Sequence, residues 1–302
     1  MVNRVLVTGA TGYIAQQLLP TLRARYQLVL IDVKAENRQG ERVDDVAIVD
    51  LIDTDRSQYA HLFDSVDAVV HLGYKRRSGE PLEHFFAEHQ NVIMAYNVLR
   101  CAYEAGVPRV AIASSNHAAD WYEHNLIHAH KLEVLDPYQL PLSDNFYGWA
   151  KATYEHLGFL FANGLGGFGE DSGRQRHTAN LASGRKMGVV MVRIGAPREL
   201  DVSLYQDDAA NYKRDLGAYI SSRDLTQLFT KAIETPNIDN EHGIPWQVVY
   251  GISNNTRAFW SLANARQVLG YEPQDDSEVK FAHDVRQVLM DQGTPGGRVG
   301  GV

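Results

Sequence analysis

A tyrosine and a lysine stand four residues apart at Tyr147 and Lys151. On a helix this spacing places both side chains on one face, about one turn apart. A phenol normally titrates near pH ~10 and is a poor base at neutral pH, but a neighbouring ammonium group stabilises the phenolate and lowers its pKa. The pair can therefore move a proton to or from a substrate. Alone, such a pair arises easily by chance and is usually a surface or packing feature.

Two serines supply a further functional group upstream. Ser114 and Ser115 follow the apolar run at residues 110–113, which predicts a strand. A hydroxyl at the end of this strand could hydrogen-bond the substrate oxygen that Tyr147 deprotonates. His117 stands two residues further on, and it is either a site residue or a packed structural histidine.

A glycine-rich turn at the start of the chain predicts a dinucleotide site. An apolar strand at residues 5–7 runs into the turn of Gly9 and Gly12, and helical spacing of apolar residues follows. Such glycines let the backbone approach a pyrophosphate, which the N–H groups of the helix then bind. The alternative is an ordinary turn between a strand and a helix.

An acid at the end of the second predicted strand indicates which dinucleotide binds. Asp32 lies twenty residues beyond Gly12, where a carboxylate can accept hydrogen bonds from both hydroxyls of the adenosine ribose. Its charge would repel a 2′-phosphate, so NAD is favoured over NADP. The alternative is a solvated acid. Asp50, at the end of the third strand, is a candidate for the adenine amino group. With NAD bound, Lys151 could also hydrogen-bond the nicotinamide ribose.

Alternating strand and helix patterns predict an α/β fold, a Rossmann-type doubly wound parallel sheet with a smaller C-terminal substrate-binding portion. The apolar patterns predict strands at 5–7, 28–32, 46–49, 66–73, 110–113, 189–194 and 247–250, and helices that include 82–105, 147–162, 224–234 and 259–269. Residues 1–162 form the expected NAD-binding core with the catalytic residues. We expect a surface insertion at 163–188, the remaining sheet and substrate-binding portion at 189–292, with a polar loop through Asp215, and a flexible tail at 293–302.

Composition excludes several classes of protein. The 302 residues are 44% hydrophobic and 22% charged with a net charge of −8, which argues against nucleic acid as a partner. The single cysteine, Cys101, excludes an internal disulfide and reads as a core residue. The first strand leaves no room for a signal peptide, and no apolar run approaches the ~20 residues that span a membrane, so we expect a cytoplasmic protein.

Three histidines gather in a polar stretch at His124, His128 and His130. No carboxylate or cysteine spacing beside them matches a metal-binding pattern. We therefore expect exposed side chains and no metal.

The order of these features resembles the extended short-chain dehydrogenase/reductases of the NAD-dependent epimerase/dehydratase group. The resemblance extends to about residue 273. The residues that carry it are the segment 8–15, Asp32, Asp50, the segment 71–73, Ser114–Ser115, Tyr147, Lys151 and Arg193. Within the group the chain is most similar to uronate dehydrogenases, through the segments 114–117, 192–195 and 221–225.

The resemblance implies a set of roles. Tyr147, as phenolate, takes the proton of a sugar C1 hydroxyl while hydride passes to NAD, giving a lactone. Ser115 is the catalytic hydroxyl, Asn116 and His117 contact the sugar, and Arg214 pairs with the substrate carboxylate. The implied cofactor-binding residues are Gly9, Thr11, Gly12, Tyr13, Ile14, Asp32, Asp50, Leu51, Leu72, Gly73 and Lys151. A homodimer or higher homo-oligomer is expected, through the helices at 82–105 and 147–162.

The chain departs from uronate dehydrogenases at two places near the expected sugar. Ala196 replaces a serine, and residues 74–78, with the basic run at 75–77, replace a small polar segment. Our hypothesis is that a residue of this run, with Arg76 as the candidate, recognises an anionic substituent such as a sugar phosphate. The alternative is a solvated loop. A sugar epimerase or dehydratase and a non-catalytic NAD-binding protein also stay open.

Overall fold

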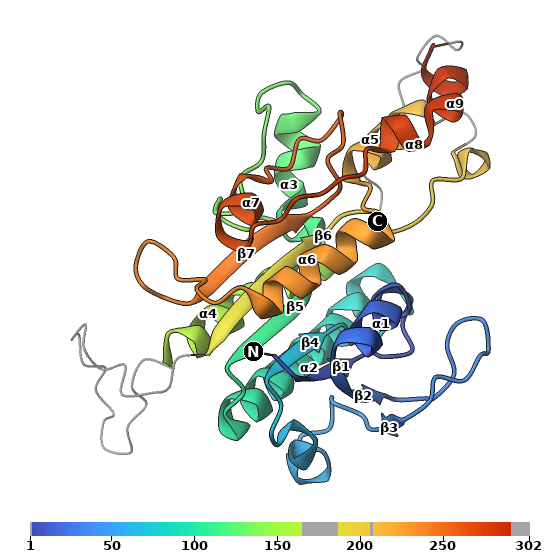
Figure 1. Ribbon diagram of the computed structural model, residues 1–302. Helices are drawn as coiled ribbons and strands as arrows, with labels where there is room; N and C mark the ends of the chain where they lie inside the picture. Colours follow the sequence, from blue (N-terminus) through green and yellow to red (C-terminus); the bar gives the residue numbers. More distant parts are fainter. Residues whose placement is uncertain (1, 165–186, 206–207, 291–302) are drawn as a thin grey trace.

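A parallel sheet forms the centre of the molecule (Figure 1). The structure is a computed structural model that describes residues 2–164, 187–205 and 208–290. Its strands are β1 (Arg4–Thr8), β2 (Gln27–Asp32), β3 (Val46–Ile48), β4 (Ala68–His71), β5 (Arg109–Ser115), β6 (Gly188–Ile194) and β7 (Trp246–Gly251). The seven-stranded order is β3-β2-β1-β4-β5-β6-β7, and every pairing is parallel. The predicted doubly wound sheet is confirmed. The strand order reverses between β1 and β4, so a ligand crevice is expected at their carboxyl ends.

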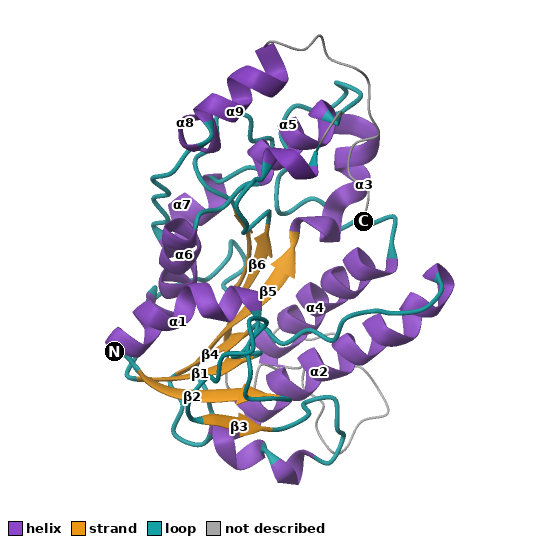
Figure 2. Ribbon diagram, turned by 90° about the vertical axis from the view of Figure 1, so that its right-hand side faces the viewer, coloured by secondary structure: helices purple, strands orange, loops and turns teal. Residues whose placement is uncertain are grey.

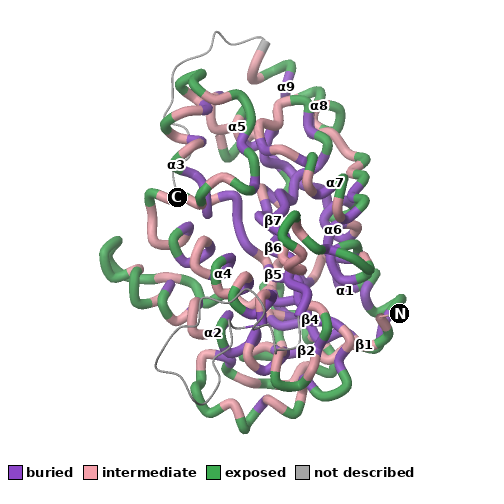
Figure 3. The backbone as a smooth tube through the Cα atoms, turned by 90° about the vertical axis from the view of Figure 1, so that its left-hand side faces the viewer, coloured by how far each residue is buried: buried purple, intermediate pink, exposed green. Residues whose placement is uncertain are grey.

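Helices cover both faces of the sheet (Figure 2). They are α1 (Tyr13–Arg25), α2 (His84–Ala105), α3 (Asp120–Tyr122), α4 (Phe146–Ala162), α5 (Ala209–Ala218), α6 (Ser222–Glu234), α7 (Ala263–Leu269), α8 (Ser277–Lys280) and α9 (Ala282–Val285). The helices α1 and α6 pack on one face, and α2 and α4 pack on the other. Side chains of β1 alternate between the two cores: Val5 and Val7 face the α1 side and Leu6 faces the α2 side. Figure 3 shows that burial follows the strands through the middle of the molecule.

The start of α4 is held by side-chain hydrogen bonds. Asn145 is its N-cap, and its Oδ1 accepts from the backbone N–H of Gly148 at 2.9 Å. A Cβ atom at Gly148 would overlap the carbonyl oxygen of His117 and the side chain of Ser143. The helix therefore approaches the end of β5 closely, and this contact places Tyr147 beside Ser115.

The smaller C-terminal portion lies beyond the carboxyl ends of β5 and β6 (Figure 2). It has its own small core of five buried side chains: Leu200, Tyr212, Leu216, Tyr219 and Val285. The expectation of a polar loop through residue 215 is wrong, because α5 forms there with Asp208 as its N-cap. The helix predicted for 259–269 begins only at Ala263.

Two expected segments, the insertion at 163–188 and the tail at 293–302, fall almost entirely outside the described residues. Among the helices that the structure describes, none has the length and apolar character needed to cross a membrane.

Candidate active site

The glycine turn lies against the end of β4. Gly9 has φ +66°, and a Cβ atom there would stand 2.8 Å from the backbone of Leu72 and Gly73. The N–H of Gly12 donates to the carbonyl of Gly9 at 2.9 Å and closes the turn at the start of α1. Only glycine fits at residue 9, because a side chain would be strained in this conformation and would collide with backbone.

A cleft of about 1120 Å³ runs from this turn along the carboxyl ends of the strands. All of the expected cofactor residues line it: Gly9, Thr11, Gly12, Tyr13, Ile14, Asp32, Asp50, Leu51, Leu72, Gly73 and Lys151. Asp32 is oriented by the turn, since its Oδ2 accepts from the N–H of Thr11 at 2.9 Å and from its hydroxyl at 2.8 Å. Ser115, Tyr147 and Arg76 line the same cleft. A backbone cradle at one end and a proton-transfer group at the other fit an extended dinucleotide such as NAD.

The proton-transfer group comes from β5 and α4. Ser115 ends β5 and is buried, and Lys151 is 4% exposed. The Nζ of Lys151 donates to the carbonyl oxygen of Ala113 at 2.9 Å. Its ammonium group also lies among three tyrosine rings, at 4.5 Å from the ring centre of Tyr154, 5.4 Å from that of Tyr74 and 5.6 Å from that of Tyr147.

Burial dominates the acid–base properties of this pair. It lowers the pKa of Lys151 to about 8, against the opposing effect of Glu88 and Glu155. Burial raises the pKa of Tyr147, while a hydrogen bond with Ser115 and the charge of Arg77 lower it. We expected Lys151 to lower the pKa of Tyr147. In the chain by itself the net direction is upward, because burial removes water from the phenolate and the charge of Glu88 also raises this pKa.

A buried ion pair fixes α4 to β6. Arg193 Nε and Nη2 donate to the two carboxylate oxygens of Glu155 at 2.8 and 2.7 Å, and Ser114 donates to the same carboxylate at 2.8 Å. Arg193 Nη1 reaches the hydroxyl of Tyr250 at 3.0 Å. Because Glu155 lies one turn after Lys151, this pair sets the position of the helix that carries the lysine. Sequence reasoning missed Glu155, although its four-residue spacing from Lys151 was a signal.

The other expected substrate residues line a second hollow of about 390 Å³ that shares Gly195 with the cleft. Asn116, His117 and Arg214 all border it. The Nδ1 of His117 pairs with the buried carboxylate of Asp120 at 3.0 Å, and its ring stands edge-on to Tyr147 with 5.7 Å between ring centres. The structure thus brings these residues to the same end of the cleft as Tyr147.

Arg214 already has two carboxylate partners in the protein. Its Nε and Nη2 donate to Glu123 at 2.6 and 3.0 Å, and its Nη1 donates to Asp215 at 3.0 Å. The side chain of Glu123 is fully buried and that of Arg214 is 9% exposed. The planar fork of Arg214 is therefore occupied, and a substrate carboxylate would have to compete with Glu123.

The basic run reaches the reaction centre more directly than expected. Lys75 and Arg76 line the cleft, and the guanidinium of Arg77 lies 5.6 Å from the ring centre of Tyr147. Over the described ranges, no carboxylate lies within ion-pair distance of Lys75, Arg76 or Arg77. The sequence pointed to the whole run and put Arg76 forward as the candidate, because the spacing within a loop does not show which side chain turns toward α4.

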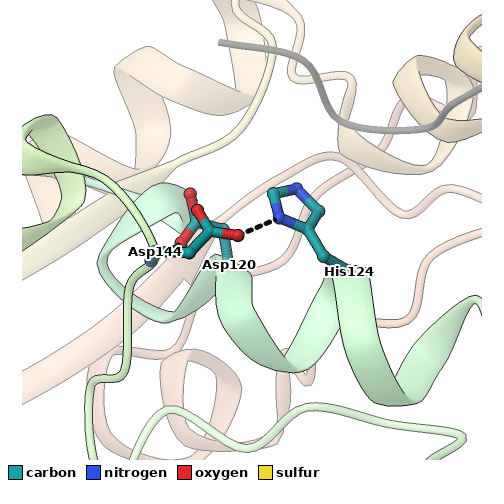
Figure 4. A group of neighbouring side chains, drawn as sticks. All are labelled: Asp120, His124 and Asp144. Atoms are coloured by element: carbon teal, nitrogen blue, oxygen red, sulfur yellow. Dashed lines mark hydrogen bonds and ion pairs between the residues drawn. The ribbon is translucent and has the colours of Figure 1, made fainter. Parts of the chain in front are cut away.

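Two of the three clustered histidines are paired rather than exposed. His124 Nδ1 contacts Asp144 Oδ2 at 2.7 Å (Figure 4), and His128 Nε2 contacts Glu123 at 3.4 Å. Only His130 is exposed. The ligand atoms of Asp120, His124 and Asp144 all lie within 4.8 Å of one another. These contacts join the segment after β5 to the start of α4, since Asn145 Nδ2 also donates to Asp120 at 2.7 Å.

A parallel sheet with a glycine turn after β1, a serine at the end of β5 and a Tyr/Lys pair on α4 defines a short-chain dehydrogenase/reductase. Residues 5–163 match the model of the NAD dependent epimerase/dehydratase family, and the chain belongs to this family.

Relatives of known name cover nearly the whole chain. An NAD-dependent glucose-6-phosphate dehydrogenase of Haloferax volcanii is 30% identical over 280 residues, 90% of this chain and 94% of the relative. A uronate dehydrogenase of Pseudomonas syringae pv. tomato is 28% identical over 92% of this chain and 84% of its own. The solved structure of a mutated uronate dehydrogenase is 27% identical, with a TM-score of 0.69, over 96% of this chain and 88% of that one. The chain is an NAD-dependent oxidoreductase.

Proposed function

We propose that the protein oxidises C1 of a cyclic sugar that carries an anionic group, using NAD⁺ and giving the lactone. The observation that carries the proposal is the position of Arg77, a cation without a carboxylate partner among the described residues, beside the proton-transfer residue Tyr147. Two of the similar proteins are named for glucose-6-phosphate and for uronate, and both of these sugars are anions.

Three side chains of the chain share the proton transfer. Tyr147, as phenolate, accepts the proton of the C1 hydroxyl, and Ser115 hydrogen-bonds the same oxygen. Lys151 stabilises the phenolate by its charge. NAD⁺, when bound, supplies the hydride acceptor and a positive ring that adds to this stabilisation. Acid–base help of this kind contributes ~10²–10⁴-fold to the rate.

The charges around the two hollows favour a phosphate over a carboxylate as the anionic group. The second hollow holds Arg198 and Arg214 against Asp208, Asp215 and the buried Glu123, so it offers no excess of positive charge from these groups. The loop at 75–77 has three positive charges and no carboxylate in ion-pair distance in the described structure. A dianion gains more from such a cluster than a monoanion. A sugar phosphate is therefore our first candidate, and a uronate is the alternative.

The test is a substrate screen with NAD⁺ that follows NADH by absorbance. Glucose 6-phosphate, glucuronate, galacturonate, glucose and arabinose should separate phosphate, carboxylate and neutral sugars, and NMR of the product should show a lactone. An epimerase or dehydratase would convert sugar without accumulating NADH. A non-catalytic protein would bind NAD⁺ and convert none of these sugars. Either result would overturn the proposal.

The role of Arg77 can be tested by substitution. Arg77→Ala should raise KM for anionic sugars about 10- to 100-fold and leave KM for neutral ones unchanged, because a charged hydrogen bond contributes about 1.5–3 kcal/mol. Arg23→Ala, which removes an exposed arginine from α1 on the other face of the sheet, is the matched control. An equal loss with neutral sugars would assign Arg77 to the proton-transfer group alone.

We also propose a homodimer through α2 and α4. These helices expose large apolar side chains on adjacent surfaces: Phe86 is 62% exposed, Leu160 is 39% exposed and Trp149 is 37% exposed. Patches of this kind mark protein interfaces. Light scattering after size exclusion should give twice the chain mass, and Phe86→Asp should shift the equilibrium toward monomer. A monomeric parent protein at micromolar concentration would contradict the proposal.

A further inference from the structure

A second carboxylate, Glu88 on α2, lies near the Tyr147–Lys151 pair. Its side chain is fully buried. It accepts a hydrogen bond from the hydroxyl of Tyr74 at 2.7 Å and one from Asn91 Nδ2 at 3.2 Å. Within the described structure no lysine, arginine or histidine forms an ion pair with it. A buried carboxylate satisfied only by neutral donors keeps its field unscreened.

Tyr74 connects this carboxylate to the proton-transfer residues. Its ring stands edge-on to that of Tyr147, with 5.5 Å between ring centres and an interplanar angle of 85°. The Nζ of Lys151 lies 5.4 Å from the centre of the Tyr74 ring. The hydroxyl on the same ring donates to Glu88. Tyr74 thus lies between α2 and α4, with one end on the carboxylate and its ring against the tyrosine and the lysine.

The backbone beside Tyr74 is held from the same turn of α2. Asn91 Oδ1 accepts from the N–H of Lys75 at 2.7 Å, and its Nδ2 donates to the carbonyl of Lys75 at 2.9 Å. Because Asn91 lies three residues after Glu88, one turn of α2 positions both the tyrosine ring and the start of the basic run.

We propose that Glu88, together with Tyr74, is a positioning residue that acts as a buried counter-charge for Lys151 and fixes the ring of Tyr147. The inference rests on the proposed function for its catalytic consequence, but the charge coupling can be measured without substrate. Nothing in the Tyr/Lys motif itself requires an acid on α2, so the counter-charge is a property of this chain.

The other ionisable groups that face the pair leave this role to Glu88. The groups from the surrounding elements are His71 of β4, Arg77 of the loop, His117 after β5, Tyr154 and Glu155 of α4, and Arg193 of β6. Glu155 also raises the pKa of Lys151, but its carboxylate is held by Arg193, and His117 pairs with Asp120. Burial lowers the pKa of His71 to about 3, so this side chain is neutral.

The sign of the effect is the same for both members of the pair. The charge of Glu88 raises the pKa of Lys151 and also raises the pKa of Tyr147. Removal of this charge should therefore lower both values together. If Tyr147 must lose a proton and Lys151 must keep one, the whole bell-shaped profile of kcat against pH should move toward acid.

The first experiment is an NMR titration of the full protein labelled with ¹⁵N-lysine, with the Lys151 side-chain signal assigned by Lys151→Met. In Glu88→Gln the titration midpoint of Lys151 should fall by about one pH unit. Glu88→Asp should keep the parent midpoint, because it keeps the charge. Glu83→Gln removes an exposed charge from the residue before α2 and should also leave the midpoint unchanged. An unchanged midpoint in folded Glu88→Gln would overturn the proposal.

The second experiment measures kcat against pH with the sugar found by the screen. Both limbs should move to lower pH in Glu88→Gln, while Tyr74→Phe should reduce kcat several-fold with a smaller movement of the limbs. If Glu88→Gln lowers the maximal kcat but leaves both limbs of the pH profile at the parent pH, Glu88 only packs against its neighbours, and the inference is overturned. A shifted NMR midpoint in a protein that oxidises no sugar would overturn the proposed function and leave the counter-charge standing.

Discussion

Two buried carboxylates flank Lys151, and they are satisfied in different ways. On the side of β6, Glu155 receives two hydrogen bonds from Arg193 and one from Ser114. On the side of α2, Glu88 receives hydrogen bonds from Tyr74 and Asn91, both of them neutral. Both side chains are almost inaccessible to solvent.

The difference separates a structural charge from a functional one. The charge of Glu155 is paired with Arg193, so this ion pair mainly holds α4 to the sheet. The charge of Glu88 has no such partner, so its field acts on the ionisable groups around it. It raises the pKa of Tyr74, which is hydrogen-bonded to it, and also the pKa values of Lys151, Tyr147 and Tyr154. Removal of Glu155 would leave the permanently charged Arg193 buried without a partner, whereas Lys151 can respond to the loss of Glu88 by a lower pKa.

The largest predicted effect is on stability. Glu155→Ala should lower the free energy of unfolding by about 3–5 kcal/mol, because Arg193, 1% exposed, would be left buried without a counter-charge. Glu88→Gln should cost about 1 kcal/mol, since an amide can still accept from Tyr74. Urea unfolding followed by circular dichroism measures both. Equal losses in the two variants would contradict the distinction between the two carboxylates.

The next effect is a pH dependence of stability that comes from Lys151. Its pKa is about 8 in the folded chain, below the ordinary value of 10.5. Between these values the unfolded chain binds more protons than the folded one, so stability should rise with pH across this window. The free energy of unfolding of the parent relative to Lys151→Met should therefore increase by up to about 3 kcal/mol from pH 7.5 to 10.5. A flat difference would show that Lys151 is better solvated than its burial indicates.

The fold followed from the sequence because its signals are local. Each strand is a short apolar run bounded by turn residues, and the order of strands and helices leaves few topologies. The failures occurred where local signals conflict. The segment at 209–218 is polar and reads as a loop, but α5 forms because Tyr212 and Leu216 join a small core with Leu200 and Val285. Here tertiary packing, and not the local preference of the sequence, stabilises the helix.

In the site, too, the residues with local signals could be predicted and those that depend on distant partners could not. The residues that line the cofactor cleft follow strand ends at fixed offsets, so the order of the chain is enough to find them. The partners of the charged residues lie far away in sequence. Arg214 and Glu123 are 91 residues apart, and Arg193 and Glu155 are 38 apart. A lone glutamate in a helical pattern reads as part of a solvated face, so the buried state of Glu88 could not be predicted.

Two glycines on α4 allow the packing of its two ends to be compared. A Cβ atom at Gly148 would overlap the backbone of His117, whereas one at Gly158 would meet the flexible end of Met191. Gly148→Ala should cost about 1–3 kcal/mol and also lower kcat, because the start of the helix would move away from Ser115. Gly158→Ala should cost stability with little change in kcat, since Met191 can adjust. Thermal unfolding and kcat of both variants check this, and equal losses of kcat would refute it.

The smallest predicted effect concerns a third buried carboxylate, Asp120, which is held by His117 and by the amide of Asn145. Asn145→Ala removes the N-cap of α4 and should cost about 1 kcal/mol. Asn145→Asp keeps an acceptor for Gly148 but replaces the donor to Asp120 with a like charge. If the cap alone matters, Asn145→Asp should match the parent. If Asp120 needs a neutral donor as Glu88 does, Asn145→Asp should be less stable than Asn145→Ala and should disturb His117. We expect the second result, measured by urea unfolding and by the NMR chemical shifts of the His117 ring.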